Sequence, residues 1–554
     1  MSRPVPRPSS VRVSLAVLAA CLVSASGVVA QEGRVDPARL NAHTAVLAGD
    51  DFEGRAPTTP GEERSVTWIA EQFRALGLEP AGDDGTYFQA VPINRFVQDG
   101  PAVITADAGG QTITLQRGTD IISNSHRPQN RISIADAPVV FVGYGVDAPE
   151  RGWDDFKGVD VRGKVVLMLV NDPDFEVAAD SPTAGKFDGQ GMTYYGRWVY
   201  KFEEAARRGA AAVFVIHETA AAGYPWNTLQ NSSTAPGLDI VRADPERERV
   251  QAQGWIQQAQ AARLMTAAGL DYATLKAAAQ RADFRPVALE GVTMSFDFGQ
   301  TFSRLTTRNV AARLPGTERP NETVMYGAHW DAYGRAVANA AGDDIYNGAV
   351  DNATGVAAVL ELARLYAEAP RTDRSVMFVS WAAEEAGLLG AYHYAAHPLA
   401  PLETTVVNIN MDSLLPGPAS SEIVVIGFGK TDAQNRLADL ASEEGRSLIP
   451  DPAPQVGAFY RSDHFPLAKM GVPALFAAAG FTGASDASRA YVRDRYHQPT
   501  DEWSSDWSME GAAQDVQLLY RVGRDLANNR DWPLWTPGNE FEAVREASAA
   551  SRQQ

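Results

Sequence analysis

The alternation of apolar and polar positions predicts helices near the start of the chain and strands after them. Between residues 36 and 82, apolar side chains such as Ile69, Phe73 and Leu76 recur at three- and four-residue spacing, which is typical of amphipathic helices. The next residues, from about 88 to 115, form a β-rich stretch. We therefore expect helices within residues 36–82, followed by strands within residues 88–115.

The pattern of apolar runs and turns changes near residue 135, and the new pattern continues to about residue 292. Short apolar runs at residues 139–145 and 164–170 have the length of buried strands and are separated by glycine and aspartate turns. A helix is predicted over residues 195–208, and a further strand over residues 211–216. This block has its own strands, helix and turns but little clustering of catalytic residue types. We interpret it as a domain inserted into another one.

From residue 309 onward, predicted strands and helices alternate, which is typical of an α/β domain. The strands fall at residues 323–328, 374–382, 404–411, 422–427 and 473–479, and the helices at residues 354–367, 387–397 and 509–527. Residues 31–134 and 293–541 would then form one catalytic domain around an insertion at residues 135–292. The polar, alanine-rich residues 542–554 are predicted to be a flexible tail.

The first thirty residues have the organisation of a secretory signal peptide. Arg3, Arg7 and Arg12 form a charged region, residues 13–23 an apolar region, and residues 28–30 a small-residue cleavage site. We therefore expect residues 1–30 to be removed and the protein to be exported, to the periplasm or the extracellular space.

Cys21 offers an alternative to plain cleavage. Residues 18–21 resemble a bacterial lipobox, in which Cys21 would carry a lipid anchor. Because Cys21 is the only cysteine, ordinary cleavage would leave a mature chain with neither disulfides nor thiol chemistry. No later run approaches the ~20 apolar residues that a membrane-spanning helix requires.

Length and charge narrow the class further. With 554 residues, 45% hydrophobic and 21% charged, the chain is an ordinary globular protein of two or three domains. Its formal charge of −19 argues against nucleic acid as a partner, because phosphate binding needs a basic face. The same charge argues against binding to an anionic membrane surface.

The candidate chemistry lies mostly where predicted strands end. Open α/β sheets build their sites at the carboxyl ends of strands, and imidazole and carboxylate groups are ligands that a hydrolytic zinc site uses. The candidate ligands are His329, Asp351, Glu385, Asp412 and His497. Taken singly, each has an ordinary structural explanation, such as a buried histidine or a helix cap. Their order and their common position at strand ends favour a metal site.

Two further acids accompany these ligands. Glu384 and Glu385 follow a buried strand and cannot both face one metal, so one would bind it while its neighbour takes a proton from water. As a pair alone, they are also compatible with a solvated helix start, where acids favour the helix dipole. Asp331, two residues after His329, would accept the second ring N–H of a histidine if the strand pleat continued.

These segments resemble the M28 family of zinc metallopeptidases, which includes bacterial aminopeptidases and the glutamate carboxypeptidase group. The resemblance is carried, in family order, by His329-Trp-Asp331, Asp351-Asn352, Glu384-Glu385, Asn410-Met-Asp412 and Tyr496-His497-Gln-Pro499. It covers most of residues 300–530 and extends to residues 51–55 and 461–464. The middle block is similar to the protease-associated domain that is often inserted in such enzymes.

The resemblance implies a fold and a set of roles. The fold would be α/β: a three-layer zinc-exopeptidase (phosphorylase/hydrolase-like) domain with a mixed central sheet, plus a β-rich inserted protease-associated domain. Two Zn²⁺ ions would be bound, with Asp351 bridging them, His329 and Asp412 completing the first site, and Glu385 and His497 the second. Glu384 would be the general base that activates the bridging water, Asp331 would orient His329, and the Asp351–Asn352 bond would be cis. Tyr496 and Tyr460 are candidate donors to the oxyanion.

The function implied is an exported di-zinc aminopeptidase that removes N-terminal residues from peptide substrates. Three alternatives stay open. A carboxypeptidase of the glutamate carboxypeptidase type would hold the terminal carboxylate with arginines, for which Arg461, Arg489, Arg493 and Arg495 are candidates. A glutaminyl cyclase would use one zinc, and a receptor-like binding protein would have lost catalysis. The sequence leaves the preferred side chain and the oligomeric state open.

Overall fold

The computed structural model describes residues 1–2, 33–233, 235–478 and 485–552. The predicted signal peptide, with Cys21, lies outside the described residues apart from its first two. Residues Arg34–Gln554 form a single unit by their contacts. Within the described part of the chain, no helix combines the length and the apolar character needed to cross a membrane.

Two helices open the chain, as the apolar spacing predicts. Helix α1 (Pro37–Leu47) begins after Asp36, whose carboxylate accepts the N–H of Ala38 at 2.9 Å and caps the first turn. Helix α2 (Pro60–Ala75) buries a stripe that includes Ile69 and Phe73. Between the two helices, the short segment η1 (Asp50–Arg55) carries Arg55 into the interior, where its side chain is 1% exposed.

The core of the C-terminal half is a mixed sheet. Its strands are β13 (Arg319–His329), β16 (Arg374–Trp381), β17 (Thr405–Asn410), β18 (Glu422–Ile426), β19 (Ser447–Pro450) and β20 (Ala474–Ala478). The order is β19-β18-β20-β17-β13-β16, with β13 parallel to β16 and β17, and β17 parallel to β20. Strand β18 runs antiparallel to β20. Because β16, β13, β17 and β20 are parallel, their carboxyl ends lie along one edge, where a site is expected.

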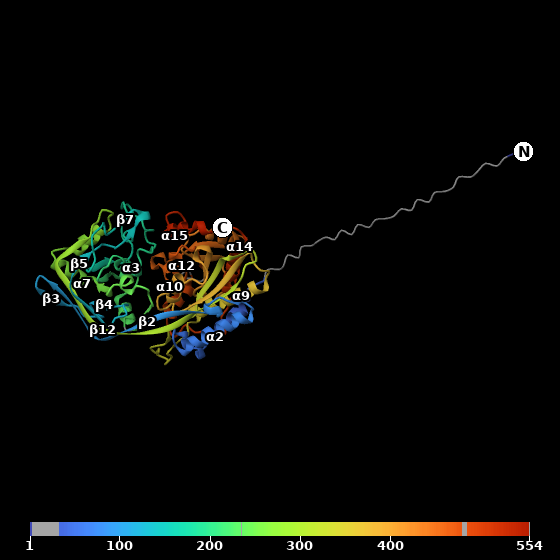
Figure 1. Cartoon of the computed structure of the whole chain (residues 1–554), viewed down its shortest axis with the longest axis horizontal. Coiled ribbons are helices and arrows are strands. Elements are labelled where there is room, and N and C mark those ends of the chain that lie inside the picture. Colours follow the sequence, from blue (N-terminus) through green and yellow to red (C-terminus); the bar gives the residue numbers. More distant parts are fainter. Residues whose placement is uncertain (3–32, 234, 479–484, 553–554) are drawn as a thin grey trace. The chain divides into compact units, whose positions relative to one another are not determined.

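Helices cover both faces of this sheet and give the three layers that the resemblance implies. Alternate residues of β13 point to opposite faces: Tyr326 packs in the cluster that contains α9 (Thr354–Glu368) and α14 (Glu510–Asn528). Met325 packs in the cluster that contains residues of α10 (Leu389–Ala396) and α12 (His464–Lys469). The predicted alternation of strands and helices after residue 309 is therefore confirmed (Figure 1).

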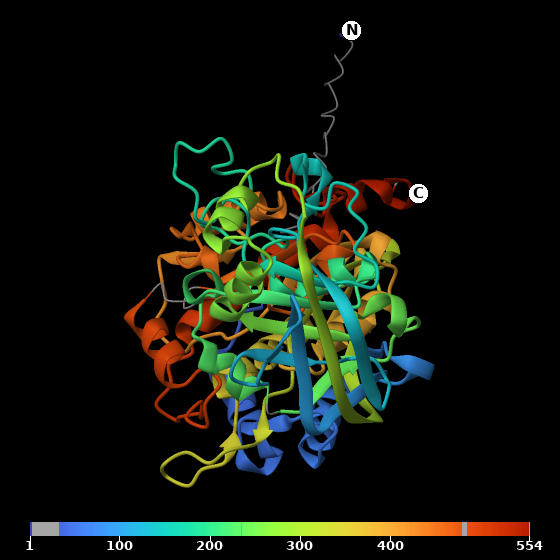
Figure 2. The same ribbon diagram turned by 90° about the vertical axis from the view of Figure 1, so that its left-hand side faces the viewer.

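A long antiparallel pair of strands joins this sheet to the rest of the fold. Strand β2 (Phe88–Ala108) pairs with β12 (Val287–Leu314) from Phe88 opposite Val310 to Ala108 opposite Val292. The last residues of β12 pair with β16, whereas its first part pairs with β5 (Arg131–Phe141). The sheet thus continues without interruption from one half of the fold into the other, and Figure 2 shows its long strands lying side by side.

The middle block forms its own lobe on that continuation. Parallel strands β5, β8 (Val165–Leu169), β9 (Ala212–His217) and β11 (Ala252–Gln257) are flanked by α3 (Trp198–Arg207), α7 (Gln258–Ala267) and α8 (Tyr272–Ala279). Two shorter strands, β3 (Gln111–Thr114) and β4 (Ile121–Asn124), pair with β2 and β11. We call these elements the middle lobe. Strands β3 and β4 precede residue 135, where the inserted domain is expected to begin.

The C-terminal residues differ from expectation. Residues 542–554 were predicted to be a flexible tail, but Glu542–Ala547 form α15 and Ala549–Arg552 a short 3-10 turn. Arg545 is 1% exposed and donates hydrogen bonds to the carbonyl oxygens of Thr405 (3.0 Å) and Val406 (3.4 Å). One buried arginine therefore fixes the segment against β17, which an alanine-rich, polar composition does not indicate.

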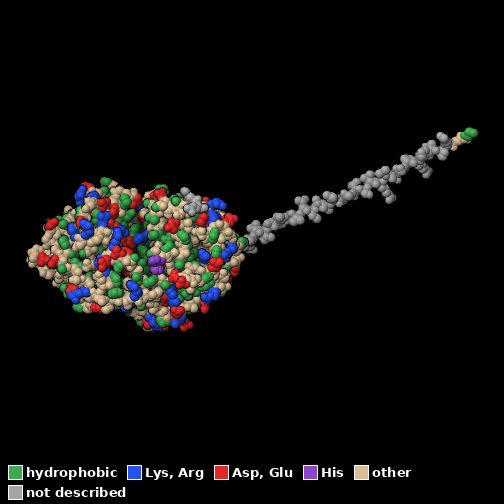
Figure 3. All heavy atoms as spheres, viewed as in Figure 1, with side chains coloured by type: hydrophobic (Ala, Val, Ile, Leu, Met, Phe, Trp, Pro, Cys, Tyr) green, Lys and Arg blue, Asp and Glu red, His purple; other side chains and the backbone are tan. Residues whose placement is uncertain are grey.

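Charged side chains of both signs are interspersed over the molecular face drawn in Figure 3. On that face the acidic excess of the chain is therefore spread out.

Candidate metal centre

The structure brings the five predicted ligands together at the carboxyl edge of the sheet. His329 ends β13, Glu385 follows β16, Asp412 follows β17, Asp351 lies in the turn before α9, and His497 follows α13 (Asp486–Asp494). They form two groups of three, His329–Asp351–Asp412 and Asp351–Glu385–His497. Within each group the candidate ligand atoms all lie within 4.8 Å of one another. Asp351 is common to both groups.

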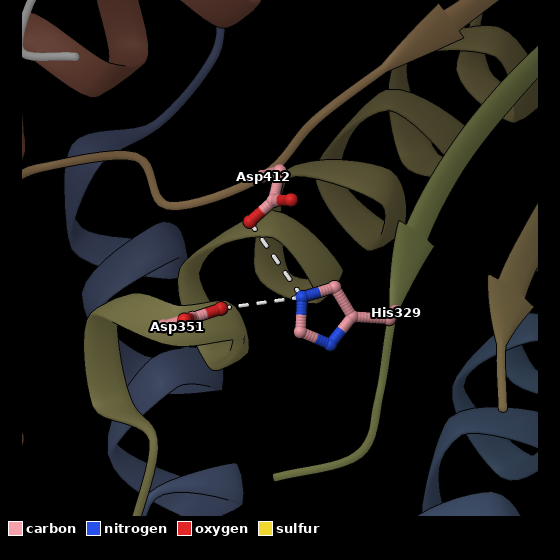
Figure 4. Close-up of side chains that lie close together, drawn as sticks. All are labelled: His329, Asp351 and Asp412. Carbon is pink, nitrogen blue, oxygen red and sulfur yellow. Dashed lines mark ion pairs between the residues drawn. The ribbon is translucent and has the colours of Figure 1, made fainter. Parts of the chain in front are cut away.

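His329 is the centre of the first group. Its Nε2 atom lies 3.2 Å from Oδ1 of Asp351 and 3.6 Å from Oδ1 of Asp412 (Figure 4). The side chain is 1% exposed, yet Nε2 has no hydrogen-bond partner among the described residues. A buried polar nitrogen without a partner lowers the stability of the fold. A cation shared with the two nearby carboxylate oxygens would explain this arrangement.

The second group is built around His497. Its Nε2 atom lies 3.3 Å from Oδ2 of Asp351 and 3.5 Å from Oε2 of Glu385. The hydroxyl of Tyr333 lies 3.0 Å from the other ring nitrogen, Nδ1, and so orients the imidazole. The two oxygens of Asp351 therefore face different histidines. Tyr333 was not among the predicted site residues, because a tyrosine four residues after His329 has no distinctive sequence signal.

Asp351 is held by partners that are distant in sequence. The carboxylate of Asp501 accepts the N–H of Val350 and the N–H of Asp351, both at 3.1 Å. Gly348 adopts φ 54°, and a Cβ atom there would lie 2.3 Å from the carbonyl oxygen of Asp351, so only glycine fits. The Asp351–Asn352 peptide bond is cis, as the resemblance implies.

Arg55 fastens the segments on either side of the two groups. Its guanidinium donates to the carbonyl oxygens of Leu47 (2.7 Å), Trp330 (2.8 Å), Asn347 (2.6 Å) and Gly348 (2.8 Å). Trp330 directly follows His329, and Gly348 directly precedes the turn that carries Asp351. The resemblance already included residues 51–55, and these bonds supply the physical reason.

Asp412 is positioned by Ser462. The hydroxyl of Ser462 donates to Oδ2 of Asp412 at 2.7 Å and accepts a hydrogen bond from Nδ2 of Asn410 at 2.8 Å. The side-chain amide of Asn352 donates to the carbonyl oxygen of Met411 at 3.1 Å, which ties the end of β17 to the start of α9. The first group is therefore held through backbone and side-chain contacts from three segments.

Asp331 makes contacts different from those predicted. Its carboxylate accepts the N–H of Glu384 (3.0 Å) and the N–H of Glu385 (3.3 Å). Nδ1 of His329 lies 3.8 Å from that carboxylate but 3.1 Å from the backbone carbonyl oxygen of Asp331. Strand β13 ends at His329, so the pleat assumed for Asp331 does not continue. Asp331 thus positions the glutamate pair, and its carbonyl group, rather than its side chain, faces the histidine.

The two tyrosines named as oxyanion donors are placed differently. Tyr496 lines a cavity of about 390 Å³ together with Asp351, Glu384 and Asp412, and its ring stacks on that of His497 at 3.6 Å between centroids. Tyr460 does not line this cavity. Its buried hydroxyl donates to Oε1 of Glu540 at 2.5 Å. The expectation that Tyr460 donates to the oxyanion is wrong, because its hydroxyl is hydrogen-bonded to Glu540, which is distant in sequence.

The electrostatics of the site reflect crowded, buried carboxylates. Burial, with the negative charge of Glu385 beside it, raises the pKa of Glu384 well above its usual range. Burial also raises the pKa of Glu385 to about 7. For Asp351, burial opposes ionisation, but contacts with His329 and His497 keep its pKa below the usual range. Although burial favours a neutral His329 ring, the charges of Glu384 and then Asp351 raise its pKa well above normal.

This residue set fits two zinc ions. Histidine nitrogens and carboxylate oxygens are ordinary zinc ligands, and each group offers three of them around one point. The three ligand carboxylates, with Glu384 beside them, carry up to four negative charges, which two divalent cations would offset. One of these cations would also bind Nε2 of His329, which has no hydrogen-bond partner among the described residues.

Part of the chain is similar to known peptidases. The model of peptidase family M28 matches residues 309–520. Aminopeptidase YwaD of Bacillus subtilis (strain 168) is 26% identical over 204 residues, which cover 36% of this chain and 41% of that protein. Aminopeptidase NAALADL1 of Mus musculus is 34% identical over 113 residues, or 19% of this chain and 14% of that one. The chain thus matches less than half the length of these relatives.

Among solved structures, the aminopeptidase from Aneurinibacillus sp. strain AM-1 is similar with a TM-score of 0.49. It is 20% identical, and the match covers 90% of this chain and 96% of that one.

Proposed function

Residues 309–520 of this chain belong to peptidase family M28, and from this premise we propose that the protein is a di-zinc aminopeptidase. The observation that supports the proposal most is the division of Asp351 between two groups, with one carboxylate oxygen toward His329 and the other toward His497. His329, Asp351 and Asp412 would hold one zinc ion, and Asp351, Glu385 and His497 the other. Bound there, zinc supplies Lewis-acid chemistry, which polarises the scissile carbonyl and lowers the pKa of water.

Glu384 is the residue that the proposal makes the general base. It lines the cavity, belongs to neither ligand group, and places Oε2 3.9 Å from Nε2 of His329. From this position it takes a proton from the attacking water and returns it to the leaving amine. The carboxylate of Asp331 accepts the backbone N–H groups of Glu384 and Glu385. It therefore holds the base, Glu384, beside the neighbouring ligand Glu385. The Tyr496 side chain lines the same cavity and is the remaining candidate donor to the oxyanion.

The test is a digest of a mixed, unblocked peptide pool by the purified mature protein, followed by mass spectrometry. We expect single residues to be lost from the amino end, the loss to stop on addition of a chelator, and zinc to restore it. Loss from the carboxyl end would replace the proposal by a carboxypeptidase, and cyclised N-terminal glutamine would replace it by a cyclase. An unchanged pool with two zinc ions counted per chain would mean a binding protein.

We propose in addition that the protein is exported, on the support of the charged and apolar regions in residues 1–30. The amino-terminal sequence of the mature protein tests this proposal. A start after Ala30 supports plain cleavage, whereas a start at a lipid-modified Cys21 supports a membrane-tethered form. An intact Met1 in the exported fraction, or no exported fraction, would contradict export.

A further inference from the structure

Arg461 is an arginine at the cavity of the metal centre whose guanidinium has no partner among the described residues. It lines the cavity with Asp351, Glu384 and Asp412, and it directly precedes Ser462, which hydrogen-bonds Asp412. Its side chain is exposed to that space. Within the described part of the chain, its guanidinium forms neither a hydrogen bond nor an ion pair. An arginine presents five N–H donors in a planar fork, so donors suited to a carboxylate are left facing the cavity.

A second arginine approaches from the middle lobe. Arg197 immediately precedes α3, is half-buried, and its Nε atom is buried without a hydrogen-bond partner among the described residues. Burial, and then the nearby positive charge of Arg461, lower the pKa of Arg197 to about 10. Two guanidinium groups therefore lie near each other, and no described carboxylate pairs with either of them.

Contacts between the lobes hold Arg197 in this place. The N–H of Met192 donates to the carbonyl oxygen of Pro454 at 3.0 Å. Lys469 of α12 forms an ion pair with Glu203 of α3 at 2.8 Å. A Cβ atom on Gly457 would lie 3.3 Å from Cδ of Arg197, so the arginine stem runs along the loop that leads to Arg461. The proximity of the two arginines is thus built into the docking of the lobes.

Two other arginines that line the cavity already have carboxylate partners. Arg489 pairs with Asp486, and Arg493 pairs with Asp494 at 2.5 Å. The carboxylates that line the cavity, Asp351, Glu384 and Asp412, all belong to the metal centre. Two divalent cations would bring four positive charges against the three negative charges of those acids, so Arg461, with Arg197 nearby, would add to an excess of positive charge at the cavity. A bound anion would remove that imbalance.

We propose that Arg461, supported by Arg197, forms a subsite that binds a carboxylate of the substrate beside the bond to be cleaved. The inference rests on the proposed peptidase function and specifies its substrate class. The carboxylate can come from the free carboxyl terminus of a very short peptide or from an acidic side chain, and both would meet the same guanidinium fork. A cavity of about 390 Å³ lies within the size range of small-ligand pockets, ~300–1,000 Å³.

The test compares substrates that differ only in a carboxylate. Alanyl-phenylalanine and its C-terminal amide address the free terminus, while alanyl-glutamic acid α-amide and alanyl-glutamine α-amide address the side chain. For the zinc-loaded wild-type protein, we expect KM to be roughly 10- to 100-fold lower for the carboxylate member of one pair, as for hydrogen bonds to a charged group. The pair that shows the preference identifies the source of the carboxylate.

Variants assign the preference to the arginines. Arg461→Gln should abolish it while leaving kcat for the amides close to wild type, and Arg197→Gln should reduce it. Arg461→Lys should keep part of it, because lysine retains the charge but not the fork. The matched control is Arg281→Gln, since Arg281 forms a surface ion pair with Asp283 at 2.7 Å, its side chain is 69% exposed, and it does not line the cavity. We expect this control to keep the wild-type preference.

Binding without turnover separates this inference from the proposed function. In a Glu384→Gln background, calorimetric titration with alanyl-phenylalanine and its amide should show the same preference in Kd, lost when Arg461→Gln is added. Equal affinities for both members of both pairs, or a preference that survives Arg461→Gln, would overturn the carboxylate subsite. If the wild-type protein hydrolyses none of the four compounds with zinc bound, the peptidase proposal fails, and the titration still decides whether the subsite exists.

Discussion

Replacing Arg55 by methionine should loosen the two segments that carry His329 and Asp351. The guanidinium of Arg55 is buried and donates four hydrogen bonds to main-chain carbonyl oxygens, at 2.6 to 2.8 Å. Its acceptors follow His329 directly on one side and precede the Asp351 turn on the other. Methionine has a similar length and fills the space, but it offers no donor to these carbonyl groups.

The size of the effect follows from two opposing terms. Hydrogen bonds from a charged donor contribute about 1.5–3 kcal/mol each, so four of them give roughly 6 kcal/mol at the lower end. Burial lowers the pKa of Arg55 to about 10, which corresponds to about 3 kcal/mol against the charged form. Methionine removes both terms. We therefore expect the free energy of unfolding to fall by about 3 kcal/mol.

Urea unfolding of the zinc-free protein measures the stability, and zinc retained after dialysis against a weak chelator measures the metal site. Arg55→Met should lower the urea midpoint and retain less zinc than wild type. The matched control is Arg64→Met, because Arg64 forms a surface ion pair with Glu53 at 2.7 Å and its side chain is 43% exposed. Such pairs contribute about 0–1 kcal/mol. A midpoint and a zinc content equal to those of the control would refute the anchoring role of Arg55.

Three further predictions concern individual acids. Glu384→Gln should retain zinc and the fold but lose roughly 10²–10⁴-fold in kcat, and full activity would remove it as the base. Asp351→Ala should release both zinc ions, which a metal count per chain checks; two ions retained would contradict the shared ligand. For Asp239, burial is outweighed by the guanidiniums of Arg249 and Arg242, which hold its pKa at about 2. A lowered carboxyl pKa stabilises the fold above the unfolded pKa and loses that contribution as pH falls from about 4 toward 2. The stability difference between wild type and Asp239→Asn should therefore shrink by about 2 kcal/mol between pH 5 and pH 2, and a constant difference would exclude this role.

The parts of the fold that follow from local patterns could be predicted from the sequence. Strand β16 was expected at residues 374–382 and occurs at Arg374–Trp381, and helix α9 was expected at residues 354–367 and occurs at Thr354–Glu368. The apolar runs of buried parallel strands and the periodicity of helices are both short-range signals. Since His329, Glu385 and Asp412 end or follow such strands, their meeting at one sheet edge was within reach of the same reasoning. Asp351 and His497 lie outside the strands, and the family resemblance was needed to include them.

The groups that orient the ligands were not predictable in the same way. Asp501 reaches the main chain of Asp351 across 150 residues, and Ser462 reaches Asp412 across 50. A lone serine or aspartate in a loop carries no periodic signal that would reveal such a partner. The same applies to Tyr460. Its sequence position is compatible with an oxyanion donor, but in the fold its hydroxyl binds Glu540. Tertiary contacts over long sequence distances decided all three positions.

The continuity of the sheet bears on how the proposed carboxylate subsite would work. Strands β2 and β12 stay paired from one half of the fold into the other, with a register shift between Asp297 and Gly299. A hinge between the halves would have to break ladder hydrogen bonds there, and the ion pair of Lys469 with Glu203 forms a second connection. Together with the hydrogen bond from Met192 to Pro454, these connections set the spacing between Arg197 and Arg461 before any substrate binds. The backbone at Arg197 and Arg461 is therefore already ordered, and binding loses little conformational entropy there. The preference for a carboxylate should then appear mainly in KM rather than in kcat.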